Sequence, residues 1–279
     1  MGEAILGILT WINELILGLA ADDSLLTLGL ENAIPGLLRF VTQVRDTIIM
    51  PVAYVVLATF FMLELYKAST RTDAMGGTAT LGAEMVVKVL LKMALCKLAV
   101  DSSALILTSM YSATTYLTSQ MRSVTTAHTI SGGIDIAALT PYIESVGFFT
   151  GLVGLIMSFV VFLVTIAAVL LALLIVTARF IEIYVYLAIA PIPIATLANE
   201  DMSQIGKNFL KSFAAVGIQG ILIFIVLSFF PIIMTTSIVS ITSADDLLVA
   251  LAGVMGYSIL LIVAVISCGK WAKAICNAM

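Results

Sequence analysis

The residues able to do chemistry in this chain are few, and they do not form a catalytic set. His128 is the only histidine, which leaves no material for catalytic His pairs or His-based metal sites. The three cysteines, Cys96, Cys268 and Cys276, lack metal-ligand spacing and are interpreted as small apolar fillers. No G-x-x-x-x-G-K stretch occurs, so the phosphate-loop route to nucleotide hydrolysis is excluded. We therefore predict a protein that is not an enzyme, with no cofactor and no metal.

Charged residues at the end of a long apolar run are better candidates for function. Arg179 and Glu182 follow residues 148–178, which hold no charge, and their spacing lets them pair on one helix face. An ionisable residue at such an edge is a functional hypothesis, and the alternative is a structural clamp at the membrane interface. Pro191 and Pro193 then break a second apolar run, which either frees carbonyls to line a cavity or only ends a helix.

Polar residues inside the apolar runs form a second candidate group. Lys97 and Asp101 are four residues apart and are expected to pair, either facing other helices or lining a conduit. A proton relay needs several carboxylates at membrane depth, and only Asp101 and Glu64 qualify, which argues against a proton-coupled pump. We expect Arg179, Glu182, Pro191, Pro193, Lys207 and Lys211 to form a collar, and Lys97, Asp101 and Gln219 to be polar residues at membrane depth.

Glycines recur on single faces of two predicted helices. Small residues let helices approach closely, either within one subunit or between copies in an oligomer. The candidate helix-packing residues are Gly147, Gly151, Gly154, Gly217 and Gly220.

The composition tells which elements must hold these residues. Of the 279 residues, 61% are apolar and only 11% are charged, against about 25% charged in an average soluble domain. The mean hydropathy is +1.17. Long unbroken apolar runs favour helices, since barrel strands alternate in segments of about 10 residues. The fold class is therefore predicted as all-α, a polytopic membrane protein with about five transmembrane helices.

The predicted organisation has two parts. Residues 1–46 are an extracytoplasmic N-terminal segment, in which 2–20 form an amphipathic helix lying on a membrane or partner. This helix lacks the positive n-region of a signal peptide, and cleavage near Ala20-Ala21 is the less favoured alternative. Residues 47–279 form the transmembrane domain, with Pro51 in the first turn of its first span. The five spans are expected at 47–66, 93–117, 145–177, 212–235 and 246–268.

Two segments between the spans have their own predictions. Residues 118–140 are expected to be a Ser/Thr-rich loop, and residues 180–198 an interfacial or re-entrant helix broken near Pro191 and Pro193. With five spans, nine basic residues fall on one side and three on the other, which by the positive-inside rule puts the N-terminus outside and the C-terminus in the cytoplasm.

One block of sequence carries a family resemblance. ARFIEIYVYLAIAPIPIATLANE, the turn with Gly206-Lys207 and Lys211, and FAAVGIQGILIFIV resemble TrbL-like polytopic channel subunits of conjugative type IV secretion systems, closest to the compact Gram-positive forms. The specific likeness covers about residues 145–230, and the N-terminal third is similar only in span layout. Larger members have a long extracytoplasmic central loop, so substrate contacts of that loop are not carried over to the short 118–140 segment.

The resemblance implies a non-enzymatic subunit of a translocation machine in the cytoplasmic membrane. Its partners would be membrane lipid, further copies of itself, other machine subunits including ATPases, and a substrate of single-stranded DNA with relaxase, or of protein. Two alternatives stay open: a small-molecule permease, and a structural adaptor without a pore. Changing Arg179 to Glu is expected to reduce transfer without lowering the protein level.

Overall fold

The structure is a computed structural model that describes residues 2–21, 29–34, 36–74, 79–127, 140, 143, 147–238 and 244–278. All regular structure in these residues is helical, as the apolar runs predict. The chain divides into two compact units, each assembled from separate stretches of sequence. His128 and most of the predicted 118–140 loop lie outside the described residues. The part of that segment that is described, 118–127, is helical and not a loop.

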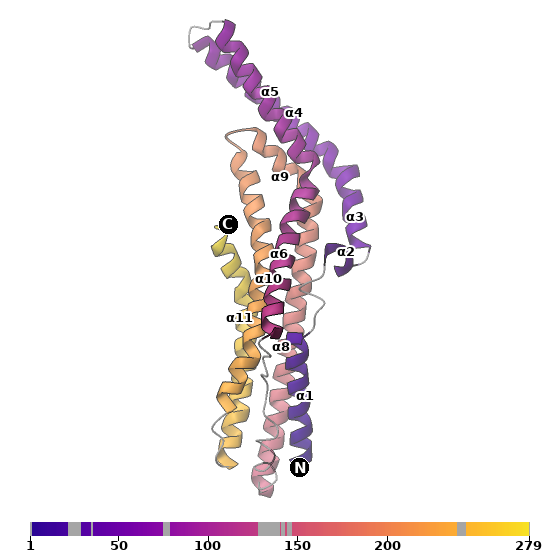
Figure 1. Cartoon of the computed structure of the whole chain (residues 1–279), viewed down its shortest axis with the longest axis vertical. Helices are drawn as coiled ribbons and strands as arrows, with labels where there is room; N and C mark the ends of the chain where they lie inside the picture. The colour runs from indigo at the N-terminus through magenta and orange to yellow at the C-terminus, as the bar shows by residue number, and fades with distance from the viewer. Residues whose placement is uncertain are drawn as a thin grey trace. The chain divides into compact units, whose positions relative to one another are not determined.

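The first unit contains Met1–Leu28, Thr115–Ala178 and Gln219–Trp271. Its helices run side by side (Figure 1). They are α1 (Gly2–Ala21) and portions of α6 (Ser103–Ala127), α8 (Phe148–Ile189), α10 (Ser203–Ile238) and α11 (Ala244–Ile275).

The amphipathic helix predicted at 2–20 is confirmed as α1. Ile5, Leu9 and Ile12 repeat at three- and four-residue intervals and are almost fully buried, so they form its packing face. Trp11 lies with its ring centroid 6.2 Å from that of Phe162 in α8. The apolar stripe of α1 is therefore at least partly covered by the protein itself.

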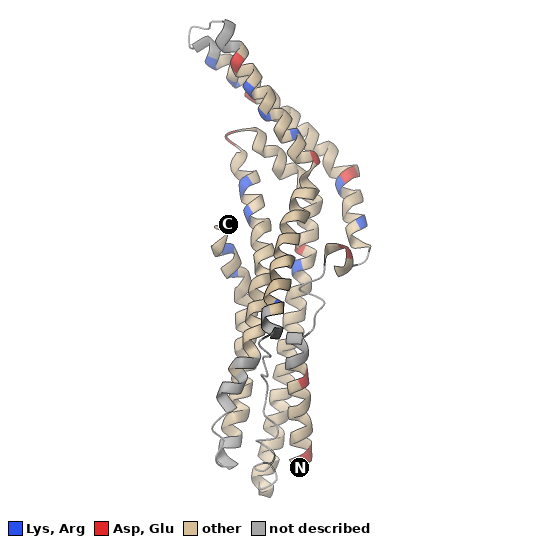
Figure 2. Ribbon diagram, viewed as in Figure 1, with Lys and Arg blue, Asp and Glu red and all other residues tan. Residues whose placement is uncertain are grey.

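The second unit contains Gly29–Thr114, Arg179–Ile218 and Ala272–Met279. Here α4 (Met50–Ala74) and α5 (Ala79–Asp101) lie side by side and antiparallel (Figure 1). The short α9 (Pro191–Ala195) contacts both of them. Charged residues gather in this unit, along α4, α5 and the start of α10 (Figure 2). The smaller elements are α2 (Leu30–Ala33), α3 (Leu37–Val44), η1 (Arg45–Ile49) and η2 (Thr196–Ala198).

Pro51 was predicted in the first turn of a helix, but the helical stretch that contains it begins upstream of it. The helix begins upstream with α3 and passes through the π-helical turn η1 before α4. In a regular helix the ring of Pro51 would collide with the carbonyl four residues earlier, and a wider π-turn relieves such a clash. The helical stretch that contains the predicted span 47–66 is therefore longer than that span.

Four helical stretches in the described residues are long and apolar enough to cross a membrane: Leu37–Arg71, Phe148–Ile189, Ser203–Phe230 and Leu248–Ile275. Each overlaps one of the five predicted spans, and the predicted class, a multi-pass helical membrane protein, is confirmed. The predicted span 93–117 crosses the junction of α5 and α6. Ser102 interrupts the helix there, and its hydroxyl donates to the Leu98 carbonyl at 2.6 Å, a bond that often bends helices. This fifth span stays a prediction.

Residues 178–189 do not form a helix separate from span three. α8 continues from Phe148 through Arg179 and Glu182 to Ile189, because two charged residues do not break a helix. The break occurs where it was predicted, at Pro191, which begins α9 at a position where a missing N–H is tolerated.

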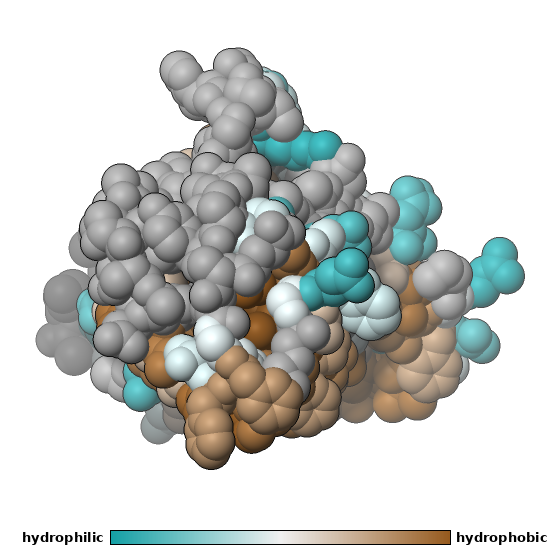
Figure 3. Space-filling model, turned by 90° about the horizontal axis from the view of Figure 1, so that it is seen from below, coloured by the Kyte–Doolittle hydropathy of each residue, from teal (hydrophilic) through white to brown (hydrophobic). Residues whose placement is uncertain are grey.

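Apolar side chains cover much of the described surface. On the face drawn in Figure 3, apolar residues (brown) cover the lower part, and hydrophilic residues (teal) project mainly at the edges. Phe148 and Phe149, at the start of α8, are 74% and 80% exposed.

Candidate functional site

Arg179 is a buried cation that forms no ion pair with a carboxylate among the residues that the structure describes. It is only 3% exposed, and its Nε donates to the Val216 carbonyl of α10 at 2.9 Å. A second guanidinium nitrogen lies 3.5 Å from the Gly217 carbonyl oxygen. The Tyr111 and Phe180 rings lie 5.7 and 5.8 Å from the guanidinium carbon, within cation–π range. Its remaining nitrogen has no hydrogen-bond partner among the described residues.

The expected pair between Arg179 and Glu182 is not formed. No ion pair within 4.0 Å joins these two described residues, and Glu182 is half-buried. The arginine head turns instead toward carbonyl oxygens of α10 that lie within hydrogen-bonding distance. Arg179 therefore fastens α8 to α10 inside the second unit.

The Pro191–Pro193 break docks onto the beginning of α10. The Thr196 hydroxyl donates to the Pro193 carbonyl at 2.7 Å and accepts from the Gly206 backbone N–H at 3.0 Å. A Cβ at Gly206 would lie 2.6 Å from the Pro193 oxygen, so only glycine fits there. The broken helix is consequently fixed against α10, and a carbonyl beside the break is used in this contact.

The six collar residues do not form one bonded cluster. Lys207 is exposed and Lys211 half-buried on α10, and neither makes an ion pair with a described residue. Arg179 and Pro193 reach α10 at separate places, near Gly217 and Gly206 respectively. Any shared role of these residues would come from their common unit rather than from direct contact.

Lys97 and Asp101 pair as predicted, with 2.9 Å between Nζ and the carboxylate. Tyr54 of α4 donates its hydroxyl to the same carboxylate at 2.7 Å, and Lys97 Nζ lies 5.8 Å from the Tyr54 ring centroid. The side chains of Lys97 and Asp101 are 61% and 40% exposed. Tyr54 lies midway along the candidate span Leu37–Arg71, so this charged group contacts the middle of that stretch.

The remaining candidates lie apart from this group. Gln219 is half-buried, and its amide nitrogen is 3.4 Å from where a Cβ of Gly269 would stand. Gly217 faces Thr114, whose Cγ2 is 3.0 Å from the position of a Cβ, whereas Gly147 has open space around it. Gly151, Gly154 and Gly220 are buried.

A polar turn between α9 and α10 was not foreseen as a site. The Asn199 side chain accepts from the backbone N–H groups of Asp201 and Met202 at 2.9 and 3.2 Å, which caps the start of α10. Glu64 of α4, only 8% exposed, accepts the Glu200 N–H at 3.0 Å. An Asn just before a helical pattern indicates a helix cap, so this part of the turn could have been predicted from the sequence. Nothing in the sequence indicated that Glu64 would contact the turn.

Ion pairs join the same turn to both helices of the hairpin. Lys67 of α4 pairs with Asp201, and Lys92 of α5 lies 3.7 Å from the Glu200 carboxylate. The Lys67 ammonium holds the pKa of the Asp201 carboxyl below its ordinary value. The polar turn is thus held against the sides of α4 and α5 at one place.

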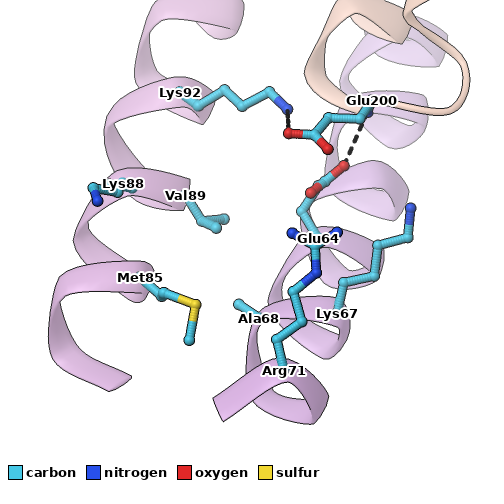
Figure 4. Close-up of a pocket in the computed structure, with 9 residues that line it drawn as sticks. All are labelled: Glu64, Lys67, Ala68, Arg71, Met85, Lys88, Val89, Lys92 and Glu200. Carbon is cyan, nitrogen blue, oxygen red and sulfur yellow. Dashed lines mark hydrogen bonds and ion pairs between the residues drawn. The ribbon is translucent and has the colours of Figure 1, made fainter. Parts of the chain in front are cut away.

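A cavity of about 330 Å³ opens at this place (Figure 4). Its walls carry four basic and two acidic side chains, so positive charge is in excess. We call it the basic pocket; it is lined by Glu64, Lys67, Ala68, Arg71, Met85, Lys88, Val89, Lys92 and Glu200.

Comparison with known families decides what kind of membrane protein this is. The model for the TrbL/VirB6 plasmid conjugal transfer like proteins matches residues 32–191, more than half of the chain. The chain belongs to the TrbL/VirB6 family. It is therefore a membrane component of conjugal transfer by a type IV secretion system, associated with the other components of that machine. Comparisons with curated proteins and with solved structures gave no match.

The matched range differs from the range of the resemblance seen in the sequence. The TrbL/VirB6 match includes the N-terminal third from residue 32, where only the span layout was similar, and it ends at Pro191. Residues 192–230, with the polar turn and most of α10, lie beyond the match. The family assignment thus includes the α4–α5 hairpin and Arg179, but not Lys207 or Lys211.

Proposed function

We propose that this TrbL/VirB6-family protein builds the membrane channel of a conjugative type IV secretion machine, as a homo-oligomer. The substrate is single-stranded DNA carrying its relaxase, or a protein, and partner ATPases supply the energy. The N-terminus lies outside and the C-terminus in the cytoplasm. One copy has too few helices to enclose a wide pore, because side chains fill a small bundle, so several copies are needed.

The group of Tyr54, Lys97 and Asp101 carries this proposal. An ion pair exposed to hydrocarbon is strongly unfavourable, so charged side chains at membrane depth face water or protein. Leu95 and Leu98, beside Lys97 on α5, are 61% and 67% exposed and suit lipid or a neighbouring copy. A helix that lines a conduit needs polar side chains toward the water and apolar side chains toward lipid or a neighbouring copy, and this part of α5 offers both.

Gene deletion tests the role in transfer. We expect an in-frame deletion in the native element to abolish donor-to-recipient DNA transfer, and the gene supplied in trans to restore it. Transfer that continues without the gene would refute the channel role. The permease alternative would then be examined by solute uptake into liposomes that hold the purified chain alone.

Cysteine substitution separates a channel from an adaptor without a pore. In an assembled machine, Lys97→Cys should react with a small water-soluble thiol reagent, and Leu98→Cys should stay protected as its matched neighbour. Gln219→Cys tests the other polar residue at membrane depth. If Lys97→Cys is as unreactive as Leu98→Cys, the conduit is wrong and the adaptor is favoured.

A further inference from the structure

The basic pocket has a chemistry that the channel proposal does not use. We propose that it binds the phosphate of an anionic phospholipid headgroup. The argument rests on the charges in its walls, on its depth relative to the first candidate span, and on the apolar surface beside it. It does not depend on whether the protein forms a channel.

Two of the four cations in the pocket, Arg71 and Lys88, form no ion pair with a carboxylate of the pocket wall. Arg71 makes no ion pair with a described residue, and Figure 4 shows its side chain extending along α4 toward Glu64. Lys88 pairs only with Glu84, an exposed neighbour on its own helix, at 2.7 Å. Exposed pairs of this kind are worth little, so a phosphate can replace them.

The other charges of the pocket keep it open. Lys67 is engaged by Asp201, and Lys92 by Glu200 at 3.7 Å. Glu64 is satisfied by the Glu200 N–H at 3.0 Å, so its carboxylate is anchored in the wall. These contacts fix the two helices and the turn around the space, and they leave Arg71 and Lys88 as the binding cations.

The depth of the pocket matches a headgroup. Tyr54 is midway along the span Leu37–Arg71, and Glu64 and Arg71 follow it by ten and seventeen residues. At 1.5 Å per residue they lie about 15 and 25 Å from the middle of the membrane. Half of the hydrocarbon core is about 15 Å thick, and headgroups extend to about 22 Å. The pocket therefore begins where the acyl chains end.

The surface beside the pocket suits acyl chains. On α5, Leu91 stands next to Lys92 of the pocket and is 63% exposed, and Leu95 and Leu98, nearer to the contact with Tyr54 at mid-span, are 61% and 67% exposed. Met85 and Val89 add apolar area to the pocket wall itself. A ligand that joins a phosphate to long apolar chains matches both surfaces, and a basic pocket between helices at this level is a known way to hold lipid headgroups. A free phosphate would use only the charges.

Lipid titration of the purified full chain tests the site. Phosphatidylglycerol is added to the protein in neutral detergent, and bound lipid is counted by native mass spectrometry. We expect the Arg71→Gln/Lys88→Gln variant to bind it roughly 30-fold more weakly, since each basic residue near an anionic surface contributes about fivefold. Lys67 and Lys92 are left unchanged because their loss would free Asp201 and Glu200.

The matched control removes the same charge elsewhere. Lys270 and Lys273 are exposed on α11, and Lys270→Gln/Lys273→Gln should bind phosphatidylglycerol like the wild type. Phosphatidylcholine should bind weakly to all three proteins. Equal loss in both double variants would mean general attraction to anionic lipid and would overturn the site. Displacement of the lipid by sn-glycerol 3-phosphate, or by an acidic peptide, at equal concentration would overturn a lipid as the ligand.

A measurement on the unaltered protein guards against a misfolded variant. Phosphatidylglycerol with a diazirine next to its headgroup is photolysed with wild-type protein, and the adducts are mapped by peptide sequencing. Adducts on Ala68, Met85 or Val89 would support the pocket, and adducts confined to other helices would refute it.

Discussion

At the scale of single residues, Arg179 shows how an arginine is kept in an apolar bundle without an acidic partner. Two carbonyl oxygens of α10 and two aromatic rings surround its guanidinium. Such contacts offset only part of the free energy lost when a charge leaves water. What the contact provides is position: the bonds from Arg179 fix α8 and α10 at one height relative to each other.

The two obvious substitutions of Arg179 should therefore differ in their effects. Arg179→Met fills a similar volume and removes the buried charge, so we expect a change in unfolding free energy within about 1 kcal/mol. Arg179→Glu places a carboxylate against the Val216 oxygen and should destabilise by about 3 to 5 kcal/mol. Thermal unfolding in detergent measures both.

Burial thus changes the expectation for Arg179→Glu drawn from the sequence, and its protein level should fall together with transfer. Equal melting of the methionine and glutamate variants would contradict this account of Arg179.

The pair between Lys67 and Asp201 should make stability depend on pH. Lys67 lowers the pKa of the Asp201 carboxyl in the folded state. The pair therefore stabilises the fold at pH values above the unfolded-state pKa of Asp201, about 3.9. This contribution is lost as the pH falls through the folded value. Asp201→Asn should therefore melt below the wild type at pH 7, and this difference should shrink as the pH falls below about 3.9. A difference that is constant from pH 7 to pH 3 would exclude the pair as its cause.

Some residue partners were readable from the sequence and others were not. Lys97 and Asp101 share a helix, so their four-residue spacing alone predicts the contact. The partner of Arg179 is a backbone carbonyl 37 residues away, and every residue carries such a group. Glu64 likewise meets a backbone N–H 136 residues away. Contacts to backbone groups cannot be predicted from residue types, because every residue has a carbonyl and nearly every residue has an N–H.

At the scale of elements, apolar runs predict the helices well and their ends poorly. Arg179 and Glu182 looked like the end of a span, but α8 passes through them and stops only at Pro191. Pro51 looked like a start, but a π-turn lets the helix begin at Leu37. Charge marks where a membrane ends, whereas a proline without a local adjustment marks where a helix ends.

The close approach between α9 and α10 gives a prediction for one glycine. Gly206→Ala would bring Cβ within 2.6 Å of the Pro193 oxygen, so one of the two backbones must move. Overpacking of this kind costs about 1 to 3 kcal/mol. Gly253→Ala in α11 is the matched control, because no atom lies within 4 Å of the new Cβ.

The control should be neutral, or stabilising by up to about 1 kcal/mol through helix propensity. Thermal unfolding of the two alanine variants in the same detergent compares them, and equal losses would remove the steric explanation.

A hydroxyl pair within the first unit gives a second prediction for elements. Thr165 of α8 and Ser258 of α11 are buried, with 3.0 Å between their hydroxyl oxygens. Bonds of this type between membrane helices are worth about 0.6 kcal/mol on average. A double-mutant cycle with Thr165→Val and Ser258→Ala should give a coupling free energy of unfolding near that value. Additive effects of the two substitutions would show that the contact contributes nothing to stability.

At the scale of the whole molecule, the protein is a multi-pass helical member of a conjugal transfer family. Composition alone predicted the helical membrane class, because 61% apolar residues exceed what a soluble domain can bury. The position of the charges was less predictable. Lys67, Lys92, Glu200 and Asp201 converge because the turn before α10, more than a hundred residues later in the chain, packs against the α4–α5 hairpin.

The unequal distribution of basic residues predicts the direction of the whole chain. Nine basic residues on one predicted side against three on the other favour a cytoplasmic C-terminus. Green fluorescent protein fused after the last residue should then fluoresce, and alkaline phosphatase fused there should be inactive. The opposite pair of results would reverse the proposed orientation and move the basic pocket to the outer surface.

The bond from Arg179 to Val216 also has a consequence for biosynthesis. Its acceptor lies 37 residues later in the chain, so α8 is made before the carbonyl it needs exists. At about 5 to 20 residues per second, the delay is about 2 to 7 seconds. During that time the charged head stays hydrated at the edge of the bilayer or inside the insertion machinery. We therefore expect the final packing of α8 to wait until α10 has been synthesised.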